Sequence, residues 1–394
     1  MDIRKLLEEN KDYIIAMRRE FHRHPEISWQ ETGTMARIEA QLDAMGIEHE
    51  RVEHGGVLGY IYGGKPGKTV LLRADIDALP VLESAENLKG AKPCVSENEG
   101  VCHACGHDGH IAGLLGAAKI LGEHREELAG TVVLMFEEAE ELMENVVRLQ
   151  DRVEERGLKV DTAAGLHLYA AMDTGKIAIL DGNTMSGAYL FHVVLKGRGG
   201  HGSRPDLSIS PIDCFCAVYA ALQGGRMRKV SPFDMFTLSI CKVQAGNTHN
   251  VIPDELRFAG SVRYLNMEAG KWFKAFLRET LEQICPLYEC GFEIEIESGP
   301  ALAVYNDPAC AAKGRAAVTA LFGPDCLESP EPWMASETFA ETLARWPGFF
   351  ALVGIKNEEK GTGAAHHNPK FDIDEDALVY AAGTLLSYAA DVLR

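Results

Sequence analysis

The order of predicted elements within residues 184–300 constrains the fold of this chain more than any other feature. Strands are predicted at 188–195, 235–243, 256–264 and 292–297, and helices at 210–223 and 267–284. The resulting order, βαββαβ, is that of a ferredoxin-like split βαβ sandwich. Because this pattern is self-contained, we predict that residues 184–300 form a separate small domain inserted into a larger one.

The residues on both sides of this insert show an α/β pattern. Strands are predicted at 69–77, 131–136 and 349–355, and helices at 3–21, 110–121, 308–322 and 374–393. Short apolar runs between turn residues are typical of buried strands, and their alternation with helices indicates an α/β core. We therefore predict an α/β fold in which residues 1–183 and 301–394 form one discontinuous domain, a mixed sheet with helices on both faces.

Composition excludes several classes of protein. The 394 residues include 58 acids and 39 bases, a formal charge of −19, so most of the surface would repel phosphate backbones and anionic membranes. The start, MDIRKLLEEN, contains no apolar signal segment, and no apolar run approaches the roughly 18 residues of a membrane span. We expect a cytoplasmic protein without nucleic-acid or membrane partners. Its ten cysteines lack the spacing of a disulfide framework and are expected to be free thiols.

Residues 102–110, CHACGHDGH, are the densest chemical signal in the sequence. Cysteine, histidine and aspartate are metal-binding types, and the two glycines allow the backbone to turn so that several side chains converge. Cys102 and Cys105 could instead form a redox pair, but no short thioredoxin-like strand leads into them. They could also form half of a structural zinc site, but no second pair of matching spacing exists. A metal site completed by distant residues is favoured.

Acidic residues that could complete such a site follow the predicted strand at 131–136. Glu137, Glu138, Glu140 and Glu141 lie just past its carboxyl end, where α/β sheets place their ligands. One of two adjacent glutamates can bind a metal while its neighbour handles a proton. The alternative is a solvated helix start, since acids are favoured at helix N-termini.

Histidines and aspartates elsewhere are further candidates. His167 lies inside an otherwise apolar strand, where it is either a ligand or a satisfied core residue, and the pair His366 and His367 is ambiguous from the pattern alone. Asp75 and Asp77 share one face of a strand end, so one of them could orient a histidine ligand. An ion pair with the neighbouring arginine is the alternative.

The inserted segment also carries polar candidates. His201 lies in the glycine-rich stretch 198–205, where it is expected to be exposed and mobile enough to reach a neighbouring site. Asn250 follows in NTHNVIP, and Arg263 lies in a predicted strand. Arg263 could bind a carboxylate through its planar guanidinium, or it could simply cover a sheet face.

Taken together, these segments resemble the amidohydrolase branch of the aminoacylase and carboxypeptidase superfamily of metallopeptidases, which includes hippurate hydrolase and the plant indole-acetyl-amino-acid hydrolases. The matching motifs, in order, are RREFHRHPEIS, LLRADIDALP, HACGHDGH, the paired glutamates, GLHLY, GRGGHGSRP, AGNTHNVIP, GSVR and HHNPKFDIDE. One such motif is weak, but nine in order along nearly the whole chain are specific.

The resemblance implies a two-metal centre that Cys105 bridges. His107, Glu141, His167 and His367 would complete the ligand set, with His366 the alternative if the register at the double histidine differs by one. The ions would be zinc or manganese ahead of cobalt or nickel. Residues 1–183 and 301–394 would then be the catalytic domain.

The resemblance also implies roles around the substrate. Glu140 would be the general base and acid. Of the two strand-end aspartates, we predict from the strand pattern that Asp75 orients a histidine ligand. His201 and Asn250 would approach the substrate, with His201 coming from the same or the partner subunit, and Asn250 with Arg263 would hold a carboxylate. The insert would be a lid and dimerisation domain that makes a homodimer or higher homo-oligomer.

The implied activity is dinuclear metal-dependent hydrolysis of the amide bond of N-acyl amino acids or related small amides. A dipeptidase or aminobenzoyl-glutamate-type hydrolase is the alternative within the enzymes, and a non-catalytic metal-binding relative is the alternative outside them. The acyl group, the amino acid and the stereochemistry are left open.

The chain departs from the family pattern at a few positions. Glu137 and Glu138 stand where relatives usually carry Gln-Pro, residues 142–145 replace a glycine-rich turn, and Thr338 stands where relatives often have aspartate. Added negative charge beside the site would raise the pKa of Glu140 or disfavour anionic acyl groups.

Overall fold

The computed structural model describes residues 1–143, 147–299 and 301–394. These residues form two compact units. Unit 1 comprises Met1–Thr184, Tyr305–Glu331 and Thr338–Arg394, and unit 2 comprises Met185–Val304 and Pro332–Glu337. The sequence had grouped 332–337 with the larger domain. Position 300, the predicted boundary, lies outside the described residues.

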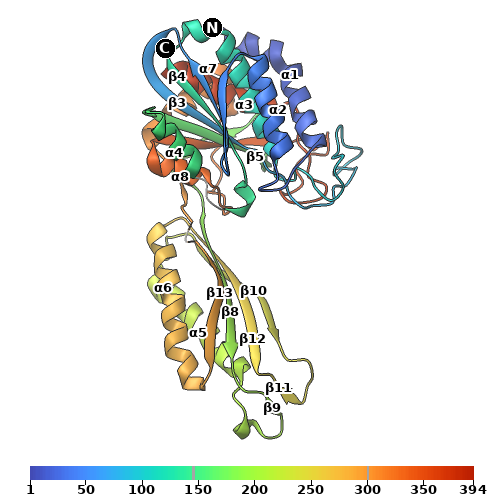
Figure 1. Ribbon diagram of the computed structural model, residues 1–394, viewed down its shortest axis with the longest axis vertical. Coiled ribbons are helices and arrows are strands. Elements are labelled where there is room, and N and C mark those ends of the chain that lie inside the picture. Colours follow the sequence, from blue (N-terminus) through green and yellow to red (C-terminus); the bar gives the residue numbers. More distant parts are fainter. Residues whose placement is uncertain (144–146, 300) are drawn as a thin grey trace. The chain divides into compact units, whose positions relative to one another are not determined.

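Unit 1 is built on a seven-stranded mixed sheet of order β1-β2-β4-β3-β5-β15-β6 (Figure 1). Its strands are β1 (Glu48–Val52), β2 (Gly56–Tyr62), β3 (Lys65–Asp75), β4 (Ala129–Glu137), β5 (Thr162–Asp173), β6 (Ile177–Ala178) and β15 (Gly348–Lys356). The adjacent strands β4, β3, β5 and β15 pair in parallel, and the pairs that involve β1, β2 or β6 with a neighbour are antiparallel. The parallel strands are apolar runs that are buried over most of their length, as strands covered on both faces should be.

The register of the parallel strands brings polar residues to one edge of this sheet. Asp75, the last residue of β3, pairs with Glu137, the last residue of β4. Arg73 pairs with Gly165 of β5, so His167, two residues further on, is level with Asp75. Because parallel strands end at the same edge, the chemistry of this unit is concentrated there.

Helices cover both faces of the sheet (Figure 1). One face carries α1 (Ile3–Arg23), α2 (Thr32–Ala44), α3 (His107–Glu123), α7 (Pro308–Phe322) and α9 (Ala377–Val392), and the other carries α4 (Val147–Glu155) and α8 (Phe339–Arg345). Alternate residues of β4 follow this division, since Val132, Leu134 and Phe136 join the core beneath the larger group of helices. The two-residue period of the strand turns the residues between them toward the opposite face.

Helix α3 lies at the centre of the larger group. All of its residues except Lys119 and Glu123 are buried. It packs against α1 and α9, and a Cβ atom on Gly116 would lie 2.6 Å from Cγ1 of Ile14 in α1. A side chain at Gly116 would therefore force α1 away from α3, the helix that begins at the predicted metal site.

Unit 2 has the order βαββαβ. Its antiparallel sheet contains β10 (Phe236–Ala245), β12 (Glu255–Tyr264), β8 (Gly187–Lys196) and β13 (Gly291–Ser298), in that spatial order. Helices α5 (Pro211–Lys229) and α6 (Met267–Ile284) pack on it around a core that includes Phe191, Phe258 and Phe273. Strands β9 (Gly200–His201) and β11 (Val251–Ile252) form a separate two-stranded sheet in this unit. A second two-stranded sheet, β7 (Gly182–Met185) with β14 (Val304–Asn306), lies where the chain passes from one unit to the other and contains residues of both.

The predicted fold class is confirmed: a mixed α/β unit with helices on both faces and a βαββαβ unit inserted into it. One helix boundary differs from the prediction. The helix predicted at 110–121 begins at His107, so a predicted metal ligand lies in its first turn. Within the described part of the chain, no helix has both the length and the apolar character that crossing a membrane requires.

Candidate metal centre

The start of α3 presents two of the predicted ligands. Gly106 precedes the helix with φ 100° and ψ 12°, a left-handed conformation that glycine adopts without strain. The turn places Cys105 just before the helix and His107 on its first turn, both buried. Nδ1 of His107 lies 2.9 Å from the backbone oxygen and 3.2 Å from Oδ1 of Asp77. The other ring nitrogen of His107 is thereby left to face the cluster.

Two groups of three donor atoms share the thiol of Cys105. One consists of Cys105, His107 and His167, the other of Cys105, Glu141 and His367, and in each the donor atoms lie within 4.8 Å of one another. Sγ of Cys105 is 3.5 Å from Nε2 of His167, and Nε2 of His367 is 3.4 Å from Oε1 of Glu141. The structure thus brings together all five predicted ligands. A donor shared by two groups is what two neighbouring ions would need.

The geometry also separates the two adjacent histidines. His366 directs Nδ1 toward Sγ of Cys105 at 3.9 Å, and its Nε2 accepts the backbone N–H of Ala170 at 3.2 Å. His367 has a positive φ of 64° and reaches Glu141 instead. In the part of the chain that the structure describes, His367 belongs to one of the three-donor groups and His366 to none.

A short turn after β4 carries the paired glutamates; we call residues 138–143 the glutamate turn. It contains the 3-10 helix η2 (Glu140–Leu142) between Ala139 and Met143, whose φ angles are 61° and 53°. Glu140 is only 6% exposed, so the solvated helix start considered from the sequence does not describe it. Its carboxylate groups with His107 and Glu141 as a third set of donors within 4.8 Å. Glu144 and Asn145, two of the departures from the family pattern, lie outside the described residues.

The donors fit divalent metal ions. Nε2 of His107 is buried and has no hydrogen-bond partner among the described residues. It lies 3.8 Å from Oε1 of Glu141, an oxygen that His367 also approaches at 3.4 Å. Burial, with Glu141 nearby, raises the pKa of the Cys105 thiol well above its ordinary value, and burial lowers that of His167. Buried polar atoms without partners cost free energy, which a cation would offset while stabilising the thiolate. Thiolate, imidazole and carboxylate together suit zinc, manganese, cobalt or nickel.

The two aspartates after β3 orient different histidines. Asp77 contacts Nδ1 of His107 and accepts the backbone N–H of Glu141 at 3.0 Å. Asp75 is the residue predicted to orient a histidine ligand. A carboxylate oxygen of Asp75 lies 2.5 Å from Nδ1 of His110, and the other lies 3.7 Å from Nε2 of His107. The second ring nitrogen of His110 accepts the backbone N–H of Leu168, the residue after His167. Asp75 therefore fixes the His110 ring, and that ring holds the backbone of β5 beside His167. The strand pattern offered Asp75 and Asp77 equally for this role, and only Asp75 was predicted to have it.

Two departures from the family pattern meet at Arg73. This buried guanidinium donates to Glu137 at 2.6 Å, to Asp75 at 2.7 Å and to the hydroxyl of Thr338 at 2.7 Å. The charge of Glu137, which the sequence suggested would add to that of the site, is therefore paired with Arg73.

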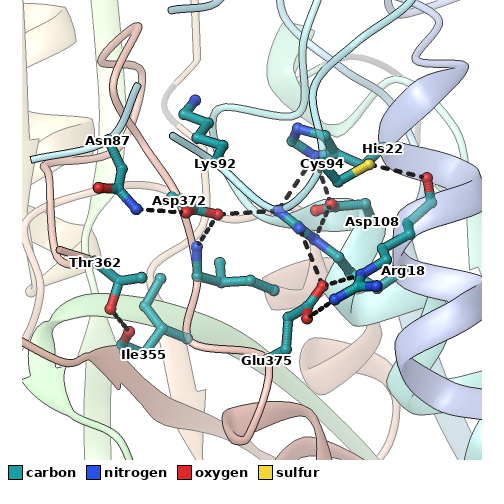
Figure 2. Close-up of polar contacts among 12 residues, drawn as sticks. Arg18, His22, Asn87, Lys92, Cys94, Asp108, Ile355, Thr362, Asp372 and Glu375 are labelled. Carbon is teal, nitrogen blue, oxygen red and sulfur yellow. Dashed lines mark hydrogen bonds and ion pairs between the residues drawn. The ribbon is translucent and has the colours of Figure 1, made fainter. Parts of the chain in front are cut away.

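A buried polar network lies behind the first turn of α3 (Figure 2). Arg18 of α1 donates to Asp108 at 2.8 Å and contacts Asp372 at 3.5 Å. His22 lies 2.8 Å from the same oxygen of Asp108 and 2.9 Å from Glu83. The RREFHRHPEIS motif thus ties α1 to the turn that carries His107.

The remaining predicted residues lie in unit 2. His201 is exposed beside Ser203, at 2.7 Å between Nδ1 and Oγ. Asn250 is exposed, and its backbone oxygen accepts the N–H of the residue after His201 at 2.8 Å. Arg263 is half-buried and donates to Ser336 at 2.8 Å, and burial lowers its pKa. His201 and Asn250 therefore lie side by side, at the paired segments β9 and β11.

Comparison with known proteins decides the family. Residues 71–391 match peptidase family M20/M25/M40. The chain belongs to this family. It is 34% identical over 400 residues to IAA-amino acid hydrolase ILR1-like 2 of Arabidopsis thaliana, covering 99% of this chain and 88% of the relative. It is also 34% identical to an N-acetylcysteine deacetylase of Bacillus subtilis, covering 97% of both chains.

A solved M20 structure agrees with this assignment. A Bacillus subtilis protein described as a dinuclear metal-binding peptidase of the M20 family shares 31% identity, a TM-score of 0.81, and coverage of 98% of this chain and 99% of its own. The resemblance recognised from the motifs is confirmed, and the protein is an amidohydrolase of the M20 family.

Proposed function

We propose that this M20 amidohydrolase hydrolyses the amide bond of N-acyl amino acids at a dinuclear metal centre. The observation that carries the proposal is the pair of three-donor groups that share Cys105 beside the buried Glu140. The names of the relatives support it, since an IAA-amino acid hydrolase and an N-acetylcysteine deacetylase both act on an amino acid that carries an acyl group.

Cys105, His107, Glu141, His167 and His367 would hold the two ions. Bound divalent ions supply Lewis acidity, which lowers the pKa of a water molecule and polarises the amide carbonyl. Glu140 accepts the proton of the attacking water and returns it to the leaving amine, so no covalent enzyme intermediate is required. Asp77 and Asp75 keep the histidines in place, Asp75 acting through His110.

The first test combines metal analysis with a panel of substrates. We expect two divalent ions per chain and turnover of N-acetyl or N-benzoyl amino acids. Removal of the ions by a chelator should abolish turnover, and zinc, manganese, cobalt or nickel should restore it. Activity only on peptides with a free α-amine would favour the dipeptidase alternative. Two bound ions without turnover of any amide would favour the non-catalytic relative.

The substrate contacts of unit 2 are a further part of the proposal. Asn250 and Arg263 would hold the carboxylate of the amino-acid half, and the imidazole of His201 would donate to the oxyanion that develops on the carbonyl. On the resemblance to the family, unit 2 would be the lid and dimerisation domain of a homodimer.

Mixing two inactive variants tests whether His201 serves the partner subunit. If it does, His201→Ala protein mixed with Glu140→Ala protein should regain part of the parent activity, because one site of each heterodimer carries both intact residues. Exchange of subunits is followed separately with a tagged chain. Complete exchange with no regained activity would restrict His201 to its own subunit.

A further inference from the structure

Glu31 precedes α2, but its carboxyl group does not cap that helix. A side-chain oxygen at this position ordinarily accepts a hydrogen bond from the free N–H groups of the first turn. Here Glu26 does so, accepting the N–H of Gly33 at 3.1 Å and that of Thr34 at 2.6 Å. The carboxyl group of Glu31 is therefore available for a partner outside the helix.

That partner is the glutamate turn, 108 residues further along the chain. Oε1 of Glu31 accepts the backbone N–H of Ala139 at 2.8 Å, and both residues are buried, at 1% and 0% exposure. Ala139 has φ 61° and ψ 35°. A left-handed conformation costs a residue with a Cβ atom about 1 kcal/mol, and such a residue persists only where its surroundings fix it. Glu31 therefore accepts a hydrogen bond from the strained residue immediately before Glu140.

The N–H group on the other side of Glu140 is held in the same way. Asp77 accepts the N–H of Glu141 at 3.0 Å, and the hydroxyl of Ser28 donates to the same oxygen of Asp77 at 2.7 Å. Residues 28–31 thus reach both flanks of Glu140, directly through Glu31 and indirectly through Ser28.

Keeping the carboxyl group of Glu31 inside the protein is costly. Burial, with Asp77 nearby, raises its pKa to about 8, and Oε2 has no hydrogen-bond partner among the described residues. Such a desolvated group is unfavourable unless its contacts compensate. Within the described ranges, the hydrogen bond given for the Glu31 carboxyl group is the one from the N–H of Ala139.

We propose that Glu31 is a positioning residue that holds the glutamate turn, so that Glu140 and Glu141 keep the orientation that the metal centre requires. The inference rests on the function proposed above, because that function gives the two glutamates their roles.

Two substitutions of similar size test it. Glu31→Gln keeps an oxygen that can accept from Ala139, whereas Glu31→Met keeps the length and removes the acceptor. We expect the Met variant to bind metal about 10-fold to 100-fold more weakly, measured by competition with a chelator, the range found when residues that orient ligands are lost. With metal saturating, its kcat should fall by a similar factor with little change in KM. The Gln variant should stay close to the parent in both measurements.

A buried residue away from the turn serves as the control. Asn306 accepts the N–H of Phe350 at 2.7 Å and is fully buried, so Asn306→Ala should lower stability without changing metal affinity. If the Met variant does not fold, Glu31→Asp replaces it, because a side chain shorter by one methylene withdraws the acceptor from Ala139.

Three outcomes would overturn the proposal. They are parent-like metal binding in the Met or Asp variant, an equal loss in the Gln variant, and an equal loss in the Asn306→Ala control. The metal measurement needs no substrate, so it decides the role of Glu31 even if the parent hydrolyses none of the amides tested. In that case the proposed function fails while the positioning role is still judged on its own result.

Discussion

Replacement of Glu140 by glutamine should lower kcat by about 10²-fold to 10⁴-fold, the usual contribution of a general acid and base. The amide is close in size to the carboxylate but cannot take a proton from water at neutral pH. Glu140 is buried, and an oxygen of its carboxylate lies within 4.8 Å of a ring nitrogen of His107 and a carboxylate oxygen of Glu141. Since Glu140 belongs to neither group that shares Cys105, we expect the variant to retain two ions per chain, as measured by elemental analysis.

Glu138 provides a matched control for this experiment. It lies in the same turn, is 6% exposed and belongs to none of the donor groups found among the described residues. Glu138→Gln should therefore keep most of the parent kcat. Parent-like turnover in the Glu140 variant would refute the assignment of the base. If kcat fell equally in both variants, the cause would be the lost negative charge of the turn and not the loss of one residue that carries the proton.

Replacement of Arg18 by methionine should destabilise unit 1 by about 3–5 kcal/mol, the cost of removing one partner from a buried ion pair. Arg18 is fully buried against Asp108 and Asp372, with Glu375 at 3.6 Å. Burial alone would raise the pKa of Asp108, but Arg18 and His22 hold it well below its ordinary value. Without the guanidinium, these carboxylates would lose their main compensating charge. Urea unfolding followed by circular dichroism measures the change.

An exposed arginine of the same unit is the comparison. Arg152 pairs with Glu50 at 2.8 Å, but its side chain is 39% exposed, so Arg152→Met should cost only about 0–1 kcal/mol. Because two units can unfold in separate steps, the loss should appear in the transition of unit 1. If Arg18→Met cost no more than the exposed control, the network in Figure 2 would not stabilise α3.

Much of the fold could be predicted because its signals are local. The apolar run at 131–136 became part of β4, and the alternation of strands and helices in 184–300 became unit 2. Helix α3 was predicted to start too late because CHACGHDGH looks polar. Its histidines are buried by the strands and helices around them, which no local pattern reveals.

The candidate site was predictable in its residue types and less so in its contacts. Cysteine, histidine and glutamate at strand and helix ends indicated metal binding, and the family motifs selected among them. The distinction between Asp75 and Asp77 depends on which histidine each one meets across the sheet edge. The contact from Glu31 to Ala139 joins residues far apart in sequence, so only the folded structure shows it. From the sequence alone, Glu31 is only an acidic residue close to a helix start. That Glu26 caps this helix in its place is visible only in the structure.

The discontinuity of unit 1 has a consequence for synthesis on the ribosome. Strand β15 pairs with β5, and α9 packs against α3, yet both are translated after residues 185–304 of unit 2. Until β15 emerges, one edge of β5 lacks its parallel partner, and such an edge can pair with another chain. His367 lies between β15 and α9 in the chain and is translated after β15. A nascent chain can therefore finish its inserted unit while the set of donors proposed to hold the ions still lacks His367.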